Sequence, residues 1–389
     1  MRLTYFISAI FATALFAGAT NPETSSSKFS SVTDIDDLAL IYIGAQHRPD
    51  WDKEHLRPYV THTYADSTQS WMFDGFLMLD FMRWNDECKA VNLGEYIGDV
   101  STQKDWSDML DEQLGTYTGN GCRALDELIG ELIPVLGKPG HKHKVVMCIP
   151  TNWTKGDWIW GTVNGREISG EDRLTAGKWY IDELQRRWTA AGFKNIELDG
   201  IYWTKESFHE DLDDHVRDIN AYSHDKGLLV YWIPYVAAKG RGEWHDWGVD
   251  VAYLQPNYYF KEERPISQLD GAIDFAKKHD MGMEVEFSAY DRSWNCTNGE
   301  RRKFPPANCG LYDIHPNYYR RLVDYIDHFE TQSIFDTKPV AYYSGFAGFY
   351  DFCKSGNEMD RKIMDRIARI INRRHQATGW DKNPAAVGK

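Results

Sequence analysis

The sequence lacks three features that would point to common binding functions: a run of clustered Lys and Arg, a paired C-x-x-C motif, and a G-x-G-x-x-G turn after a strand-like segment. Its 389 residues carry 44 Lys and Arg against 58 Asp and Glu, a formal net charge of −14 at pH 7. Nucleic-acid binding needs clustered basic side chains, so the acidic balance argues against nucleic acid and against anionic membranes. The cysteine spacing likewise matches no zinc motif.

Long apolar runs are confined to the N-terminus. "MRL" supplies a positive charge, residues 4–18 are apolar, and "AGA" at 17–19 is a small-x-small cleavage site. We expect a signal peptide over 1–19, a flexible leader over 20–36, and an exported protein, periplasmic or extracellular, without a membrane span. An N-terminal anchor is the alternative, but the run is shorter than the roughly 20 residues of a spanning helix.

Cysteine is scarce, with six in the chain. Disulfides are permitted in an exported protein. Cys296 and Cys309 bracket a polar loop and are predicted to pair, and Cys88 and Cys122, in one long connection, are a second candidate pair. Cys148 lies in the apolar run "VVMCIP" and is predicted to be a buried thiol.

Eight short strand-like runs recur along the chain. They cover residues 38–44, 73–79, 144–150, 197–203, 228–235, 250–256, 282–288 and 339–345. Stretches with helical apolar spacing follow several of them, at 174–192, 212–227, 266–282, 318–331 and 357–376.

Alternation of strands and helices implies parallel strands, and eight units predict an α/β protein with a single (β/α)8 barrel. The barrel should span 37–376, with long insertions after strands two and seven and a tail at 377–389. An open doubly wound sheet is the alternative, and the missing G-x-G-x-x-G turn counts against it.

Active sites of such barrels lie at the carboxyl ends of the strands. Amides, carboxylates and aromatic rings are concentrated there, and 14% of all residues are aromatic. No Ser stands in a G-x-S-x-G elbow, which argues against acyl transfer. Lys is nearly absent from the strand ends, which argues against Schiff-base chemistry. Amides and carboxylates bind hydroxyls and rings pack on sugars, so the combination predicts a carbohydrate partner. The candidate substrate-binding residues are Asp80, Asn152, Trp153, Asp199, Tyr202, Trp203, Trp232, Tyr235, Gln255, Asn257, Tyr258, Tyr290 and Tyr342.

Some of these positions have structural alternatives. Asp80 and Asp199 could instead cap loops, and Gln255 and Asn257 could instead form hydrogen bonds to backbone groups. Each single Trp is as well suited to the core as to a sugar platform. The "HKH" at 141–143 precedes a strand, at the wrong end of the barrel for the site, so we expect no metal role for it.

Three glutamates are the candidate catalytic groups. Glycoside hydrolysis needs one carboxyl group that donates a proton and a second that attacks the sugar or activates water. Glu206, after strand four, is the predicted acid/base, because nearby rings would raise its pKa by desolvation. Glu286 on strand seven is the predicted nucleophile. Glu284, on the same face, would support Glu286 or exchange roles with it. The alternatives are a helix first-turn acid for Glu206 and a buried ion pair for the other two.

The segments "GIYWTKES", "YLQPNYYF" and "GMEVEF" together resemble an uncharacterised family of secreted bacterial proteins of the domain-of-unknown-function kind. Its members look like glycoside-hydrolase barrels, and the resemblance covers strands one to eight. In placement the chain also resembles the large clan of retaining barrel glycosidases, whose acid/base Glu ends strand four and whose nucleophile Glu ends strand seven. That clan usually has Asn directly before the acid/base, and this chain has Lys205.

The sequence therefore predicts a secreted glycoside hydrolase that retains configuration, acts on an oligo- or polysaccharide, uses no cofactor and is a monomer. A non-catalytic glycan-binding barrel is one alternative. A lyase or a metal-dependent deacetylase is another, although the His-rich ligand sets of most such metal sites are lacking.

Overall fold

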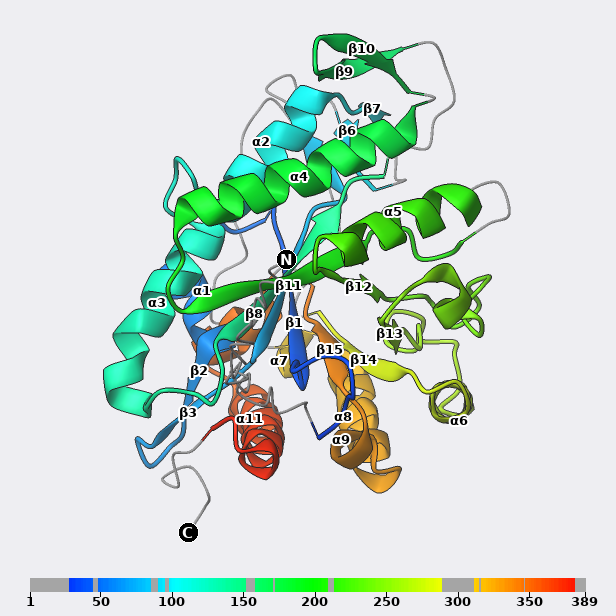
Figure 1. Ribbon diagram of the computed structural model, residues 1–389. Helices are drawn as coiled ribbons and strands as arrows, with labels where there is room; N and C mark the ends of the chain where they lie inside the picture. The colour runs from blue at the N-terminus through cyan, green and yellow to red at the C-terminus, as the bar shows by residue number, and fades with distance from the viewer. Residues whose placement is uncertain are drawn as a thin grey trace, which may run out of the picture.

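Eight parallel strands close into a barrel at the centre of the molecule (Figure 1). The computed structural model describes residues 28–44, 48–84, 90–94, 98–151, 158–170, 172–208, 213–288, 311–314, 316–345 and 347–381. The barrel strands are β1 (Asp37–Tyr42), β4 (Gly75–Leu79), β8 (His143–Ile149), β11 (Ile196–Trp203), β12 (Leu229–Trp232), β13 (Val251–Leu254), β14 (Gly282–Glu286) and β15 (Val340–Tyr343). They follow one another around the barrel in chain order, and β15 pairs with β1. The predicted fold and all eight strand segments are confirmed.

Helices surround the barrel (Figure 1). The described ones are α1 (Lys53–Val60), α2 (Gln103–Leu114), α3 (Gly121–Leu136), α4 (Arg173–Ala191), α5 (Asp213–Asp225), α6 (Ser267–Lys278), α7 (Leu311–Ile314), α8 (Pro316–Thr331), α9 (Ile334–Thr337), α10 (Gly348–Lys354) and α11 (Glu358–Thr378). The five predicted helices are α4, α5, α6, α8 and α11. In α11, for example, the Asn357 side chain accepts the Met359 N–H at the start, and Gly379 at φ 74° ends the helix.

The insertion after β4 has secondary structure of its own. It contains the three-stranded sheet of β5 (Met82–Trp84), β6 (Ala90–Asn92) and β7 (Asp99–Val100), followed by α2 and α3. A bridge between Gly94 and Thr151 connects this insertion to the chain just after β8. Two hairpins complete the fold, β2 (Thr61–Thr63) with β3 (Gln69–Trp71) and β9 (Ile159–Val163) with β10 (Arg166–Ser169). Most of the connection after β14 lies outside the described residues.

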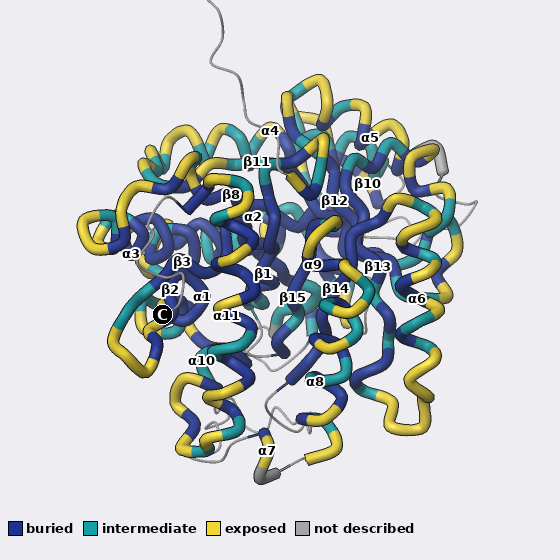
Figure 2. Tube along the Cα trace, turned by 90° about the horizontal axis from the view of Figure 1, so that it is seen from below, coloured by how far each residue is buried: buried dark blue, intermediate teal, exposed yellow. Residues whose placement is uncertain are grey.

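Both ends of the described chain pack at the amino-terminal end of the barrel. The Thr33 hydroxyl lies 2.7 Å from the Tyr231 hydroxyl, and Trp380 is 2% exposed. The segments just before β1 and just after α11 therefore pack on the barrel. In Figure 2 the barrel strands form the buried centre, and exposed residues lie on the surrounding helices and loops. No helix in the described ranges is long and apolar enough to cross a membrane.

The cysteines within the described ranges are free thiols. Cys148 is buried, as predicted, and accepts a hydrogen bond from the Asp80 backbone N–H at 3.3 Å. Cys122 is a buried thiol inside α3, which counts against its pairing with Cys88. Cys88, Cys296 and Cys309 lie outside the described residues.

Candidate active site

Glu284 and Glu286 point from β14 into the barrel. In the register of β14 with β15, Val285 lies beside Tyr342 and Glu286 beside Tyr343. Tyr342 faces the helix layer, because its ring lies 6.4 Å from the ring of Phe349 in α10. Side chains alternate along a strand, so the two glutamates face the opposite side, toward the barrel interior. They are 2% and 0% exposed, respectively.

Glu206 lies close enough to these two glutamates for their charges to interact. It follows β11 by three residues, and β12 and β13 separate β11 from β14 in the sheet. Burial, followed by the negative charge of Glu286, raises the pKa of Glu206 to about 7. Burial, with the charges of Glu286 and Glu206, also raises the pKa of Glu284 well above its usual range. The three carboxyl groups therefore form one electrostatically linked cluster across the interior.

Glu286 is the member of the cluster that hydrogen-bond donors surround. Its Oε2 accepts the Tyr325 hydroxyl at 2.5 Å, and its Oε1 accepts the Gln255 amide at 3.1 Å. Burial raises the pKa of Glu286, and these two donors, together with the backbone N–H groups of Asn257 and Tyr258, oppose that rise. Among the described residues no donor reaches Glu206 or Glu284. The hydrogen bonds therefore favour the negative charge on Glu286 and the proton on one of the other two.

The stagger of two strands lets Tyr325 reach Glu286 from the helix layer. β13 ends at Leu254, which pairs with Met283, so Glu286 stands three residues beyond the last paired position of β13. The chain after β13 turns at Asn257, which has a φ of 53°. This turn places the backbone N–H groups of Asn257 and Tyr258 at Glu286, and the Tyr325 side chain reaches Glu286 from α8.

A buried arginine in α8 fixes that same turn. Arg321 is 2% exposed, and its guanidinium donates to the backbone carbonyls of residues 258, 259, 261, 262 and 264. It also lies 3.6 Å from the centre of the Tyr258 ring. Arg321 and Tyr325 are four residues apart and therefore lie on one face of the helix. One face of α8 thus supports Glu286 both directly and through the turn.

Four half-buried rings form a continuous aromatic band at the carboxyl ends of the strands. Phe81 lies 5.5 Å from Tyr42, Tyr42 lies 5.2 Å from Tyr343, and Tyr343 lies 5.7 Å from Phe260. Tyr343 is the register partner of Glu286, so the band reaches the carboxylate cluster. None of the four was among the predicted binding residues. Their position at strand ends was visible in the sequence, but the face on which they stand was not.

Two predicted binding residues lie at the other end of the barrel. The Tyr342 hydroxyl donates to Asp37 at the start of β1, at 2.9 Å. Asp199 occupies an irregularity in β11, where the register with β8 shifts between Leu198 and Gly200. It accepts a hydrogen bond from the Tyr231 hydroxyl and lies 3.5 Å from the Lys144 ammonium group. Asp199 and Tyr342 therefore belong to polar networks near the amino ends of the strands, away from the glutamates.

Three predicted binding side chains are packed against the helix layer. The Trp203 indole donates to Asn220 of α5 at 2.7 Å, and the Trp232 ring stacks on Phe208 at 4.2 Å. Both indoles are at most 1% exposed, so neither can serve as a sugar platform. The Tyr258 hydroxyl donates to Asp324 of α8 at 2.7 Å, and Tyr258 contributes to the site only through its backbone.

The other predicted residues divide into three groups. Tyr202 faces the interior, because its neighbour Trp203 faces α5, and a bridge places Tyr235 beside Gln255. Asp80 follows β4 and is buried, with its Oδ2 3.9 Å from Arg83 Nε. Burial raises the pKa of Asp80 to about 8. Asn152, Trp153 and Tyr290 lie outside the described residues.

Within the described ranges, one grouping of three side chains has the spacing of metal ligands: Asp36, Asp74 and His375. Asp36 and Asp74 each precede a barrel strand, so this grouping lies at the end opposite the glutamate cluster.

Comparison with protein families gives one match: a model described as Domain of unknown function (DUF4855) covers residues 37–304. Comparison with curated proteins gives no match. Among solved structures, a GH113 β-1,4-mannanase shares 12% identity at a TM-score of 0.45, covering 88% of this chain and 99% of that one. The intracellular xylanase TsXylA from Thermoanaerobacterium saccharolyticum shares 12% identity at 0.42, covering 82% and 89%. A tryptophan synthase α-subunit from Pyrococcus furiosus shares 8% identity at 0.37, covering 85% and 96%. Similarity this low carries no argument about activity.

Proposed function

Because the chain belongs to the family described as Domain of unknown function (DUF4855), its activity has to be inferred from its own site, and we propose that it is a glycoside hydrolase. The observation that supports this best is the contrast between two carboxyl groups whose charges interact. Glu206 has no donor among the described residues and a pKa raised to about 7, whereas Glu286 is surrounded by donors. A proton donor opposite an ionised carboxylate is the pair that glycosidic cleavage requires.

In the proposed reaction Glu206 protonates the glycosidic oxygen as the bond from that oxygen to the anomeric carbon breaks. Glu286 attacks the anomeric carbon from the opposite face and forms a covalent glycosyl ester. Glu206, now ionised, takes a proton from water, and the resulting hydroxide displaces Glu286 from the sugar. Both carboxyl groups return to their starting states, and the configuration is retained.

Glu284 is the proposed supporting acid. It lies two residues before Glu286 on the same strand face, and its pKa is raised well above the usual range. A neutral carboxyl group at this depth leaves the negative charge of the cluster on Glu286. Two adjacent charges in a buried site would repel each other strongly, so single ionisation is the favoured state.

The aromatic band of Phe81, Tyr42, Tyr343 and Phe260 is the proposed sugar platform. Its rings are half-buried, so each keeps part of its surface accessible. The C–H faces of a pyranose are apolar and pack against such rings, while Gln255 and Tyr235 supply polar groups nearby.

A panel of oligosaccharides and aryl glycosides tests the proposal with the wild-type chain, Glu206→Gln and Glu286→Gln. Each substitution should lower kcat/KM by about 10²–10⁴-fold, the usual contribution of a positioned acid or base. Glu263→Gln, on an exposed loop, is the matched control and should retain full activity. NMR of the first-formed anomer tests retention. Full activity of both variants would refute the assignment, and binding without turnover would indicate a glycan-binding protein.

A further inference from the structure

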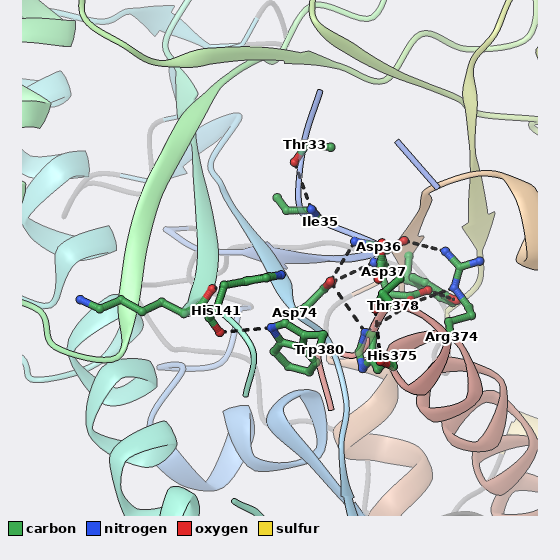
Figure 3. Close-up of polar contacts among 12 residues, drawn as sticks. Thr33, Ile35, Asp36, Asp37, Asp74, His141, Arg374, His375, Thr378 and Trp380 are labelled. Carbon is green, nitrogen blue, oxygen red and sulfur yellow. Dashed lines mark hydrogen bonds and ion pairs between the residues drawn. The ribbon is translucent and has the colours of Figure 1, made fainter. Parts of the chain in front are cut away.

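A second cluster of buried ionisable groups lies at the amino-terminal end of the barrel, where β1, β4 and α11 meet (Figure 3). Asp36 and Asp37 stand at the start of β1, Asp74 stands just before β4, and Arg374 and His375 come from α11. All five side chains are at most 1% exposed. The proposed glycosidase reaction uses none of them.

One ion pair in this cluster is complete. Arg374 Nε donates to Asp37 at 2.9 Å, and the Tyr342 hydroxyl donates to the other Asp37 oxygen at 2.9 Å. The guanidinium also donates to the Asp36 backbone carbonyl at 2.8 Å. The charge of Asp37 is therefore balanced, and Arg374 has no second charge to offer.

The remaining ionisable groups of the cluster are Asp36, Asp74 and His375. The backbone N–H groups of Asp36 and Asp37 donate to the two oxygens of Asp74, each at 2.9 Å. Those donors orient the carboxylate but carry no formal charge. Burial, with the charges of Asp36 and Asp37, raises the pKa of Asp74 well above its usual range.

His375 is the observation that points to a ligand. Both of its ring nitrogens are buried and lack a hydrogen-bond partner among the residues that the structure describes. Its Nε2 is directed at the carboxylates, 3.8 Å from Asp74 Oδ2 and 3.5 Å from Asp37 Oδ2, longer than a good hydrogen bond. Nε2, the ring nitrogen on the carboxylate side, is therefore available as a ligand atom.

We propose that Asp36, Asp74 and His375 bind one divalent transition-metal ion, with Zn²⁺ as the best fit. One ligand atom from each residue lies within 4.8 Å of the others. Two ligands that each lie about 2.0–2.2 Å from one zinc ion are about 3–4 Å apart, which matches the separation of His375 from Asp74. An imidazole ligand favours zinc over calcium or magnesium.

The proposed ion is structural, because it joins the last helix to the starts of the first two barrel strands. The Trp380 ring lies 4.4 Å from the His375 ring and 4.9 Å from the ring of His143, so the C-terminal segment covers this side of the cluster. A buried ion of this kind should exchange slowly and is best supplied during folding.

The test unfolds the full chain in denaturant with EDTA, removes the chelator, and refolds it with or without ZnCl₂. The wild-type chain should retain about one zinc per chain after gel filtration, and its Tm should be higher than that of the zinc-free protein. His375→Gln and Asp36→Asn should each lose the bound zinc and the increase in Tm. His141→Gln, a half-buried histidine 5.8 Å from the Trp380 ring, is the matched control and should retain both.

If the variants fail to fold, refolding of the wild-type chain with Co²⁺ decides the question, because protein-bound cobalt should show visible d–d absorption that zinc abolishes. Wild-type protein that refolds with no bound metal and an unchanged Tm would overturn the proposal, and a proton shared by Asp74 and His375 would then account for the cluster. Equal zinc binding by His375→Gln would overturn it as well. None of these measurements depends on glycosidase activity.

Discussion

Removal of one hydroxyl group, by Tyr325→Phe, tests the proposed electrostatics of the site. The Tyr325 hydroxyl donates to Glu286 at 2.5 Å, and both side chains are fully buried. The substitution keeps the ring that packs at 5.8 Å from Tyr258 and 5.7 Å from Phe329. It should therefore change the charge state of Glu286 with little change in packing.

The size of the effect follows from the strength of such a bond. A buried hydrogen bond to a charged group contributes about 1.5–3 kcal/mol. Since one pKa unit corresponds to about 1.36 kcal/mol, the pKa of Glu286 should rise by about 1–2 units. Gln255 and the backbone N–H groups of Asn257 and Tyr258 remain, so the carboxylate keeps part of its stabilisation.

The pH profile of kcat/KM is the first assay. Activity needs Glu286 ionised and Glu206 protonated, so the profile should fall above about pH 7, where Glu206 loses its proton. In Tyr325→Phe the acidic limb should move upward by about 1–2 pH units, which narrows the bell and lowers its maximum. Because the carboxyl groups are coupled, the two limbs belong to the cluster as a whole.

Unfolding is the second assay and needs no substrate. Burial raises the folded-state pKa of Glu286 above its unfolded value, so its ionisation destabilises the fold as the pH rises through the folded pKa. Without the Tyr325 donor that penalty should grow. The stability deficit of Tyr325→Phe should therefore be largest at neutral pH and shrink in acid.

Tyr319→Phe is the matched control for both assays. Tyr319 lies in the same helix, and its hydroxyl donates to the Met359 carbonyl at 2.9 Å; among the described residues it has no hydrogen bond to a glutamate. It should leave the acidic limb in place and give a stability deficit that does not depend on the ionisation of Glu286. Identical pH profiles for Tyr325→Phe and the wild-type chain would refute the proposed role of Glu286.

Three further results are expected. Glu206→Gln should lose less activity on aryl glycosides with acidic phenol leaving groups than on oligosaccharides, because only the latter need a proton at the leaving oxygen; equal losses would contradict a general acid. Glu286→Gln should let the pKa of Glu206 fall below about 7, as followed by infrared titration of the carboxyl band, and an unchanged value would mean that the two groups do not interact. Tyr343→Ala should raise KM, whereas Trp232→Phe should lower Tm and leave KM unchanged; the reverse pattern would mean that the band is not the sugar platform.

The architecture was readable from the sequence because parallel barrel strands are buried on both faces and form nearly continuous apolar runs. Helices with a regular apolar stripe separate those runs, and the presence of eight strand-like runs predicted a closed barrel. The candidate acids were visible in the sequence for a related reason: strand ends four and seven each carry a glutamate, and the charges of Glu206 and Glu286 interact in the folded chain.

The binding residues were harder to predict because the location of a side chain depends on the strand face it occupies and on the pairing register of the strands. Tyr342 and Tyr343 are adjacent in the sequence, yet one faces the helices and the other lies beside Glu286. The irregularity at Asp199 shifts the register in the middle of β11. Tyr325 stands in the ordinary apolar stripe of a helix, and only the early end of β13 brings its hydroxyl to a glutamate.

Helix α8 influences the acidity of Glu286 without lining the proposed binding surface. Substrate would contact the rings and amides at the mouth, whereas the acidity of Glu286 is set partly by Tyr325 and, through the turn that Arg321 holds, by a helix on the outer layer. Substitutions along that buried helix face could shift the working pH of the protein without altering any group that touches the sugar. Related chains that share the same mouth residues could therefore be adapted to compartments of different acidity by changes in α8 alone.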